Sequence, residues 1–232
     1  MIINAQIITR FFTPKVFFLI SLLFWGFSAF SQNQTAAASA CGTLFSQGQF
    51  GPYDYRTDRD KLPIVEGAHF TPEVEALIRG KTGSRPGGDI DYTLRAFPNN
   101  HRALMAMMRL GEMEKTPKPS GSRYTVECWF ERAVLFRHDD AVVRMIYSSY
   151  LTKNNRRPEA VAQLEQATVT ARENAFTHYN IGLLYFDMKI YDKSLARAHR
   201  ALELGFERDE LRDLLKNVGQ WQEPSVEPKP QQ

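Results

Sequence analysis

The two cysteines, Cys41 and Cys128, offer the clearest chemistry in this sequence of 232 residues. An even number of cysteines in an exported chain favours a disulfide, whereas the alternative is two free thiols, with Cys128 buried. A bridge would close a long loop and so lower the conformational entropy of the unfolded chain. This effect should stabilise the folded protein by about 4 kcal/mol. We predict that Cys41 and Cys128 form a disulfide, because the start of the chain, described below, indicates export.

The other residues that could do chemistry form no recognisable catalytic set. The sequence contains no HExxH, no CxxC, no glycine-rich phosphate loop and no nucleophile elbow. His69, Asp89 and Asp91 are weak catalytic candidates, in a domain that residues 41–100 would have to build. Scattered histidines are usually structural or solvated, and the chain has five of them: His69, His101, His138, His178 and His199. We therefore predict that the protein is no enzyme, with no catalytic residue, metal site or cofactor.

The first 31 residues have the pattern of a signal peptide. Arg10 and Lys15 precede the apolar run VFFLISLLFWGFSAF, and polar residues follow it. A membrane-spanning helix needs about 20 apolar residues, whereas the apolar part of a signal peptide is shorter and ends at small residues. We predict cleavage after Ser31 and a periplasmic or secreted protein. The alternatives are a membrane anchor formed by the uncleaved signal, or a lipid attached to Cys41.

Charge and composition are those of an ordinary globular chain. The net charge of +3 falls to +1 when Arg10 and Lys15 leave with the signal peptide. This near-neutral balance gives no indication of nucleic-acid binding. Residues 32–60 should be a flexible start followed by aromatic residues that pack on a helical body. Residues 219–232 are rich in Pro, Gln and Glu and predict a disordered tail.

Helical patterns fill the sequence between these ends. In an N-terminal extension, residues 61–100, we expect one helix from Thr71 to Gly80 and another over residues 90–97, capped by Asp89. Three helical hairpins follow, over residues 101–140, 141–174 and 175–208, and then a capping helix over residues 209–218. The first hairpin is longer because it contains the insertion KTPKPSGSR, residues 115–123.

The third hairpin has the most informative pattern. Its first helix carries Tyr179-Asn180-Ile181-Gly182 and Tyr185, and its second carries Ser194, Ala198 and Ala201. This pattern resembles the tetratricopeptide repeat (TPR), with His178 where the family usually has Trp. Matching positions in the second hairpin hold Ala160, Leu164 and Ala167.

The resemblance implies an all-α fold: a right-handed helical-hairpin repeat array, or TPR-like solenoid, with an N-terminal extension and a C-terminal capping helix. Together with N-terminal blocks such as Gly87–Asn99, the chain also resembles exported bacterial TPR proteins of uncharacterised role. This second resemblance implies no activity.

In TPR arrays the first helices of successive units line a groove that binds peptides or amphipathic helices. We expect the groove residues of this chain at the positions that match the family's groove positions in each repeat. They are Arg102, Met105 and Arg109 in the first hairpin, Val142, Met145, Ile146, Ser149 and Lys153 in the second, and Phe176, Tyr179, Asn180, Leu183 and Asp187 in the third. Alternatively, the chain's own aromatic segment, Phe45–Tyr55, fills this groove.

The resemblance therefore implies a protein partner, with no nucleic acid and no membrane insertion after signal cleavage. We expect an adaptor or assembly factor in an extracytoplasmic complex. The alternative is a non-catalytic accessory or recruiting subunit of an envelope enzyme.

Overall fold

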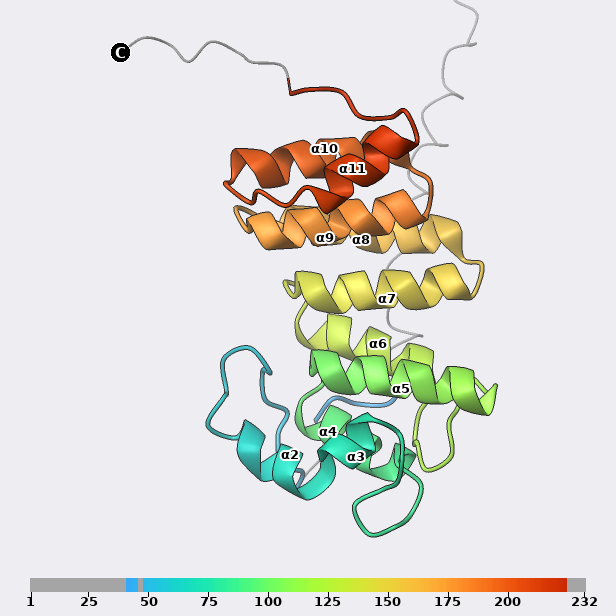
Figure 1. Ribbon diagram of the computed structural model, residues 1–232. Helices are drawn as coiled ribbons and strands as arrows, with labels where there is room; N and C mark the ends of the chain where they lie inside the picture. Colours follow the sequence, from blue (N-terminus) through green and yellow to red (C-terminus); the bar gives the residue numbers. More distant parts are fainter. Residues whose placement is uncertain (1–40, 46–47, 225–232) are drawn as a thin grey trace, which may run out of the picture. The chain divides into compact units, whose positions relative to one another are not determined.

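Ten helices and no strand make up the regular structure of residues 41–45 and 48–224, the part of the chain that the computed structural model describes (Figure 1). The predicted all-α fold is therefore confirmed. The helices are α2 (Leu62–His69), α3 (Pro72–Glu75), α4 (Gly87–Ala96), α5 (His101–Glu114), α6 (Val126–Phe136), α7 (Ala141–Lys153), α8 (Arg157–Ala171), α9 (Ala175–Asp187), α10 (Tyr191–Glu203) and α11 (Glu210–Asn217). Among the described helices, none has the length and apolarity that crossing a membrane requires. The predicted signal peptide lies outside the described residues.

Helices α5 to α10 form an array of hairpins. Helix α7 packs against α8 and α9 packs against α10, while α7 also contacts α5 and α9 on either side (Figure 1). Each hairpin begins at a polar side chain in the preceding turn: Asn100, Asp140 and Asn174 accept hydrogen bonds from backbone N–H groups in the first turns of α5, α7 and α9. These N–H groups have no partner within their own helix, so the caps fix where each hairpin starts.

Close approach of the helices depends on the residues at matching positions of the second helices. These residues are all buried: Ala160, Leu164, Ala167, Ser194, Ala198 and Ala201. Between α9 and α10, the Ser194 hydroxyl donates a hydrogen bond to the Gly182 carbonyl at 2.9 Å. A Cβ atom on Gly182 would lie 2.6 Å from a methyl group of Leu211, so this glycine lets α11 approach α9.

The N-terminal extension differs in detail from its prediction. Helix α2 was not among the helices expected from the residue pattern. The helix that follows Thr71 ends at Glu75 instead of Gly80, because Leu77 has a left-handed φ of 61° that an α-helix cannot contain. Helix α4 begins at Gly87, so Asp89 lies in its first turn and does not cap it.

Residues 41–45 and 48–59, called here the N-terminal strap, form a loop on the helical body. Three of its four aromatic residues pack beside α2 and the end of α4, as predicted, whereas Phe45 is 71% exposed. A disulfide joins Cys41 at the start of the strap to Cys128 in α6, with the two Cα atoms 5.1 Å apart. The predicted disulfide is therefore present, and it is compatible with an exported protein.

Candidate functional site

The predicted groove residues lie on α5, α7 and α9, and the side of these helices that carries them is called here the inner face. The structure exposes these residues to different degrees. Met105 and Phe176 are 40% and 57% exposed, whereas Ile146 and Tyr179 are buried. Three polar positions are exposed: Arg109, Lys153 and Asp187. The remaining groove positions, polar and apolar, are partly buried: Arg102, Val142, Met145, Ser149, Asn180 and Leu183. Ile146 and Tyr179 therefore belong to the core and present no surface to a ligand.

Helix α3 covers part of the inner face at α5. Arg102 forms ion pairs with Glu75 of α3 and, at 3.2 Å, with Glu66 of α2. Arg109, two turns further along α5, donates a hydrogen bond to the Glu75 carbonyl at 2.9 Å. The hydrogen bond from Arg102 lowers the pKa of Glu75. The two arginines of the predicted groove are thus bound by the N-terminal extension.

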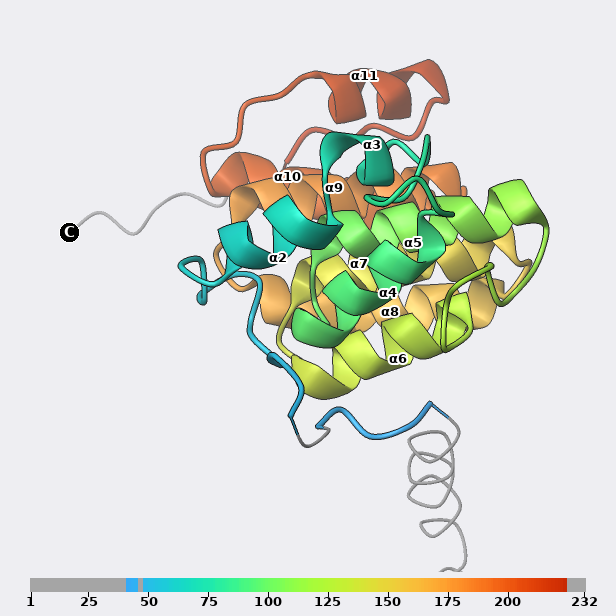
Figure 2. The ribbon, with the colours of Figure 1, turned by 90° about the horizontal axis from the view of Figure 1, so that it is seen from below.

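The C-terminal segment covers the equivalent positions of α9. The Tyr179 hydroxyl donates a hydrogen bond to Glu210 of α11 at 3.1 Å. The Phe206 ring packs on Tyr179 and on Phe176, with ring centroids 5.0 Å and 5.6 Å apart. Leu183 contacts the same apolar cluster, to which Leu211 and Leu215 of α11 also belong. In Figure 2, α3 and α11 lie on one side of the described unit and α6 lies on the opposite side.

Helix α7 lies between these covered ends. Its inner-face residues Val142 and Met145 are partly buried and pack on the main core. Ser149 donates its hydroxyl hydrogen bond to the Met145 carbonyl within the same helix. Together with Met105 on α5 and Phe176 on α9, which stay 40% and 57% exposed, these side chains give the inner face an apolar character. Such a surface can bind an apolar partner but contains no acid–base pair.

The N-terminal strap does not occupy this surface. A hydrogen bond from the Tyr53 amide to the Ala96 carbonyl holds the strap at the end of α4. The buried Arg132 of α6 donates hydrogen bonds to the carbonyls of Cys41 and Thr43, at 2.8 Å and 2.9 Å. The chain does cover part of the predicted groove, but it does so with α3 and α11, whereas the described residues Phe50 and Tyr53 of the aromatic segment pack beside α2 and the end of α4.

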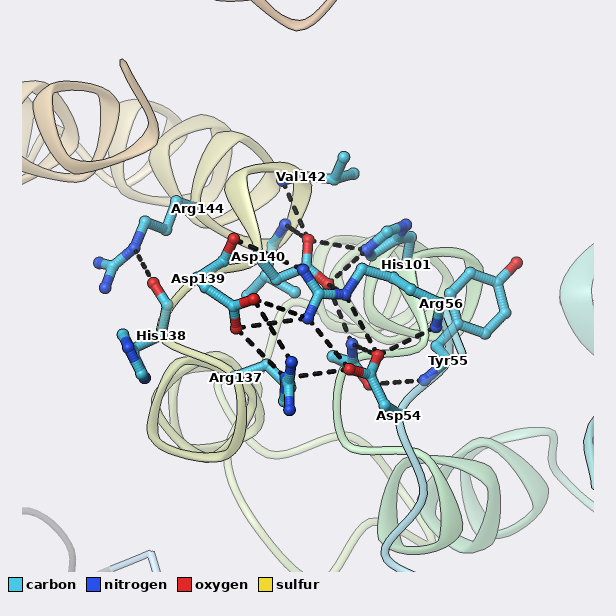
Figure 3. A network of polar contacts seen from close by, with 12 residues as sticks. Asp54, Tyr55, Arg56, His101, Arg137, His138, Asp139, Asp140, Val142 and Arg144 are labelled. Carbon is cyan, nitrogen blue, oxygen red and sulfur yellow. Dashed lines mark hydrogen bonds and ion pairs between the residues drawn. The ribbon is translucent and has the colours of Figure 1, made fainter. Parts of the chain in front are cut away.

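A network of charged and polar side chains fixes the strap to the turns between helices (Figure 3). Arg56 of the strap forms ion pairs with Asp54 at 3.0 Å, with Asp139 at 3.1 Å and with buried Asp140 at 3.5 Å. The Asn99 amide donates hydrogen bonds to Asp54 and Asp140, at 2.7 Å and 2.9 Å. The network thus joins the strap to the α4–α5 turn and the α6–α7 turn.

The network keeps its two buried carboxyl groups ionised. Burial alone would raise the pKa of Asp140, but hydrogen bonds from His101 and Asn99 and the charge of Arg56 outweigh burial and lower it. Burial also acts against Asp54, and hydrogen bonds from Arg56 and Asn99 hold the pKa of that carboxyl well below its usual range. Because both carboxylates are paired with strap and turn residues, the network acts as a structural latch.

The weak catalytic candidates are also engaged within the fold. Nδ1 of His69 lies 2.8 Å from a carboxylate oxygen of Asp89, whose other oxygen accepts a hydrogen bond from the Lys81 amide. Asp91 pairs with Arg95 at 3.0 Å, one helical turn away. His69 and Asp89 thus meet in space, as an acid–base pair would, but Asp91 takes part in a separate ion pair.

One group with metal-ligand spacing occurs among the described residues, formed by Cys41, Cys128 and Glu131. Its two sulfur atoms are bonded to each other, so neither is the thiolate that a metal would need. Glu131 lies beside the disulfide, where burial raises the pKa of its carboxyl group. We therefore read the cluster as a disulfide with a neighbouring acid.

Sequence reasoning missed the latch. It predicted the helix after Thr71 and the capping helix over residues 209–218, but not that these two helices, α3 and α11, cover part of the inner face. The N-caps at Asn100, Asp140 and Asn174 repeat at the starts of successive hairpins, which is a signal for the turns but not for the strap that binds them. Comparison of the chain with protein-family models, with curated proteins and with solved structures finds no match.

Proposed function

We propose that this chain is a protein-interaction module of the TPR type that acts in an oxidising compartment outside the cytoplasm. It binds a peptide or an amphipathic helix of another protein across the centre of its inner face. The export of the chain by its predicted signal peptide belongs to this proposal, and the disulfide between Cys41 and Cys128 is consistent with it.

One observation carries the proposal: apolar side chains remain accessible on the inner face although α3 and the C-terminal segment cover other residues of α5 and α9. Met105 and Phe176 are 40% and 57% exposed on α5 and α9, the two first helices that flank α7 and its partly buried Met145. Exposed apolar side chains that gather on one face indicate an interaction site more strongly than single ones do. The covered residues also limit the site, because α3 contacts α5 and α11 contacts α9.

Charge reversal at the exposed apolar positions tests this proposal. Met105→Glu and Phe176→Glu should each abolish co-purification of the partner that the wild-type chain captures from the cell envelope, because a carboxylate would have to be desolvated in an apolar contact. The measurement is quantitative mass spectrometry of the captured proteins, with circular dichroism to establish that each variant is folded.

The chain provides matched controls on its second helices. Leu135 of α6 and Val169 of α8 are 58% and 72% exposed, but they do not belong to the inner face. Leu135→Glu and Val169→Glu should leave capture unchanged. If the inner-face variants capture the same proteins as the wild type, or if the control variants lose them equally, the proposal is wrong.

A further inference from the structure

The insertion in the first hairpin shapes a surface pocket of about 350 Å³ beside the ends of α5 and α7. Thr116 and Pro117 of the insertion line it, together with Met108 of α5, Val126 of α6 and Tyr150 of α7. These side chains give the pocket an apolar interior, and the volume is at the lower end of the range of ligand pockets. A regular hairpin would lack the inserted residues that form this wall.

The insertion is fixed to the helical body by hydrogen bonds. The Val126 amide donates to the Pro117 carbonyl at 2.8 Å, and the Ser120 amide donates to the Glu114 carboxylate at 2.7 Å. A Cβ atom on Gly87 of α4 would lie 2.1 Å from the Ser120 carbonyl oxygen, which shows how closely the insertion approaches α4. The pocket is therefore formed before any ligand binds, so its occupation costs little ordering of the chain.

The charges at the pocket are unbalanced in favour of positive charge. Residues 115–123 contain Lys115, Lys118 and Arg123 and no acidic residue. Lys115 and Lys153 both line the pocket. Glu112, the acidic residue at the pocket, forms an ion pair with Lys153 at 2.7 Å. The ammonium group of Lys115 is thus the positive charge that a ligand would neutralise.

We infer that this pocket binds one apolar side chain of a partner peptide, and that Lys115 pairs with an acidic side chain of the same peptide. In an extended peptide, side chains alternate between two sides, so residues two positions apart point the same way. The partner would therefore carry a large apolar residue and an acidic residue separated by one position. This inference rests on the proposed function and names the chemistry of the peptide that the chain binds.

Three short peptides test the inference with the full-length, disulfide-bonded protein. They are acetylated and amidated, carry an uncharged fluorophore and have the sequences GSFSEGS, GSFSQGS and GSFSKGS. Fluorescence anisotropy should show that the acidic peptide binds at least about tenfold more tightly than the neutral one, a ratio expected for a charge-assisted hydrogen bond. Because both ends are blocked, a terminal carboxylate cannot account for the difference.

A charge swap identifies the residue responsible. Lys115→Glu should remove the preference for the acidic peptide and create a preference for the basic one. Lys118→Glu is the matched control, because Lys118 is exposed in the same insertion but does not line the pocket. This control should bind like the wild type, and thermal unfolding should show that both variants are folded.

Two results would overturn the inference. One is equal binding of the acidic and neutral peptides, or no binding at about 1 mM, which corresponds to about −4 kcal/mol. The other is an equal effect of Lys115→Glu and Lys118→Glu. The proposed function and the inference can be separated. If Met105→Glu abolishes partner capture while Lys115→Glu changes neither capture nor peptide binding, the inference is wrong and the proposed function stands; if Met105→Glu leaves capture unchanged, the proposed function is wrong.

Discussion

The two ends of the helical array are closed by different kinds of interaction. At the N-terminal end, the strap is attached by a disulfide, by the Arg56 latch and by hydrogen bonds from buried Arg132. At the C-terminal end, α11 is attached mainly by apolar contacts, in which Leu211 and Leu215 are buried against α9 and α10. Both devices cover the end of a stack whose last helices would otherwise expose apolar surface.

The two ends show that an array end can be covered in two ways, which respond to different changes in conditions or sequence. Ion pairs depend on the protonation of carboxylates, and a disulfide depends on the redox state of the surroundings. Apolar packing depends instead on the volume and shape of the buried side chains. The N-terminal closure should therefore respond to reduction and acid, whereas the C-terminal closure should respond to the loss of buried methyl groups.

Removal of the disulfide should have the largest effect. Cys41 and Cys128 are 87 residues apart in the sequence, so loop closure by the bridge should contribute about 4–5 kcal/mol to the free energy of unfolding. The double variant Cys41→Ser, Cys128→Ser should lose this amount in urea denaturation. A phosphine reductant should destabilise the wild type to the same extent and leave the double variant unchanged. A loss below about 1 kcal/mol would show that the bridge hardly constrains the unfolded chain.

Truncation of Leu211 should have the next largest effect, at the opposite end. Its side chain is 1% exposed and lies against Gly182, so Leu211→Ala should cost about 3 kcal/mol through lost burial and a residual cavity. Val218→Ala is the control, because Val218 is 42% exposed and should cost less than about 0.5 kcal/mol. Hydrogen exchange should increase in α10 and α11 and not in the strap. Equal costs for the two variants would contradict an apolar closure.

Breaking the latch should cost less than either change. Asp140→Asn keeps a capping oxygen for α7 but removes the charge that holds His101 and Arg56, so we expect a loss of about 2 kcal/mol. Asp139 contacts the same Arg56, but its side chain is 42% exposed, so Asp139→Asn should cost less than about 1 kcal/mol. Urea denaturation of the two variants measures both values. A larger cost at Asp139 would mean that the exposed pair dominates the latch.

The pH dependence should provide the smallest and most specific test. The pKa values of Asp54 and Asp140 are lower in the folded protein than the usual value of about 3.9. The unfolded chain therefore binds more protons in acid, so the stability from these groups is fully present above about pH 5 and is lost as the pH falls through and below about 4. Unfolding free energies from pH 7 to pH 3 should fall less steeply in Asp140→Asn than in the wild type. Leu211→Ala should keep the wild-type slope.

The sequence was most informative where local patterns repeat. The helices of the second and third hairpins could be predicted because small and apolar residues recur at the same positions, such as Ala167 and Ala201, which the structure buries. The register also placed the inner-face positions on α5, α7 and α9. The disulfide was predicted from the number of cysteines and the indication of export, without any knowledge of the fold.

The prediction failed where local and tertiary preferences compete. The pattern after Thr71 favoured a helix to Gly80, but the chain turns at Leu77 and places Glu75 beside Arg102. Two predicted groove residues, Ile146 and Tyr179, are buried, because the face of a helix that contacts solvent depends on what packs against it. Neither fact follows from the spacing of residues in one segment.

The sequence by itself determined the class of this protein: hairpins of amphipathic helices, capped by Asn100, Asp140 and Asn174, that stack because each must bury its apolar face. Only the tertiary structure decided which part of the inner face stays open. The contact of Arg56 with Asp139 joins residues 83 positions apart, and α3 and α11 cover α5 and α9 from different ends of the chain. A local sequence pattern reports the secondary structure that its own segment prefers. Contacts between distant segments depend instead on how the whole array packs.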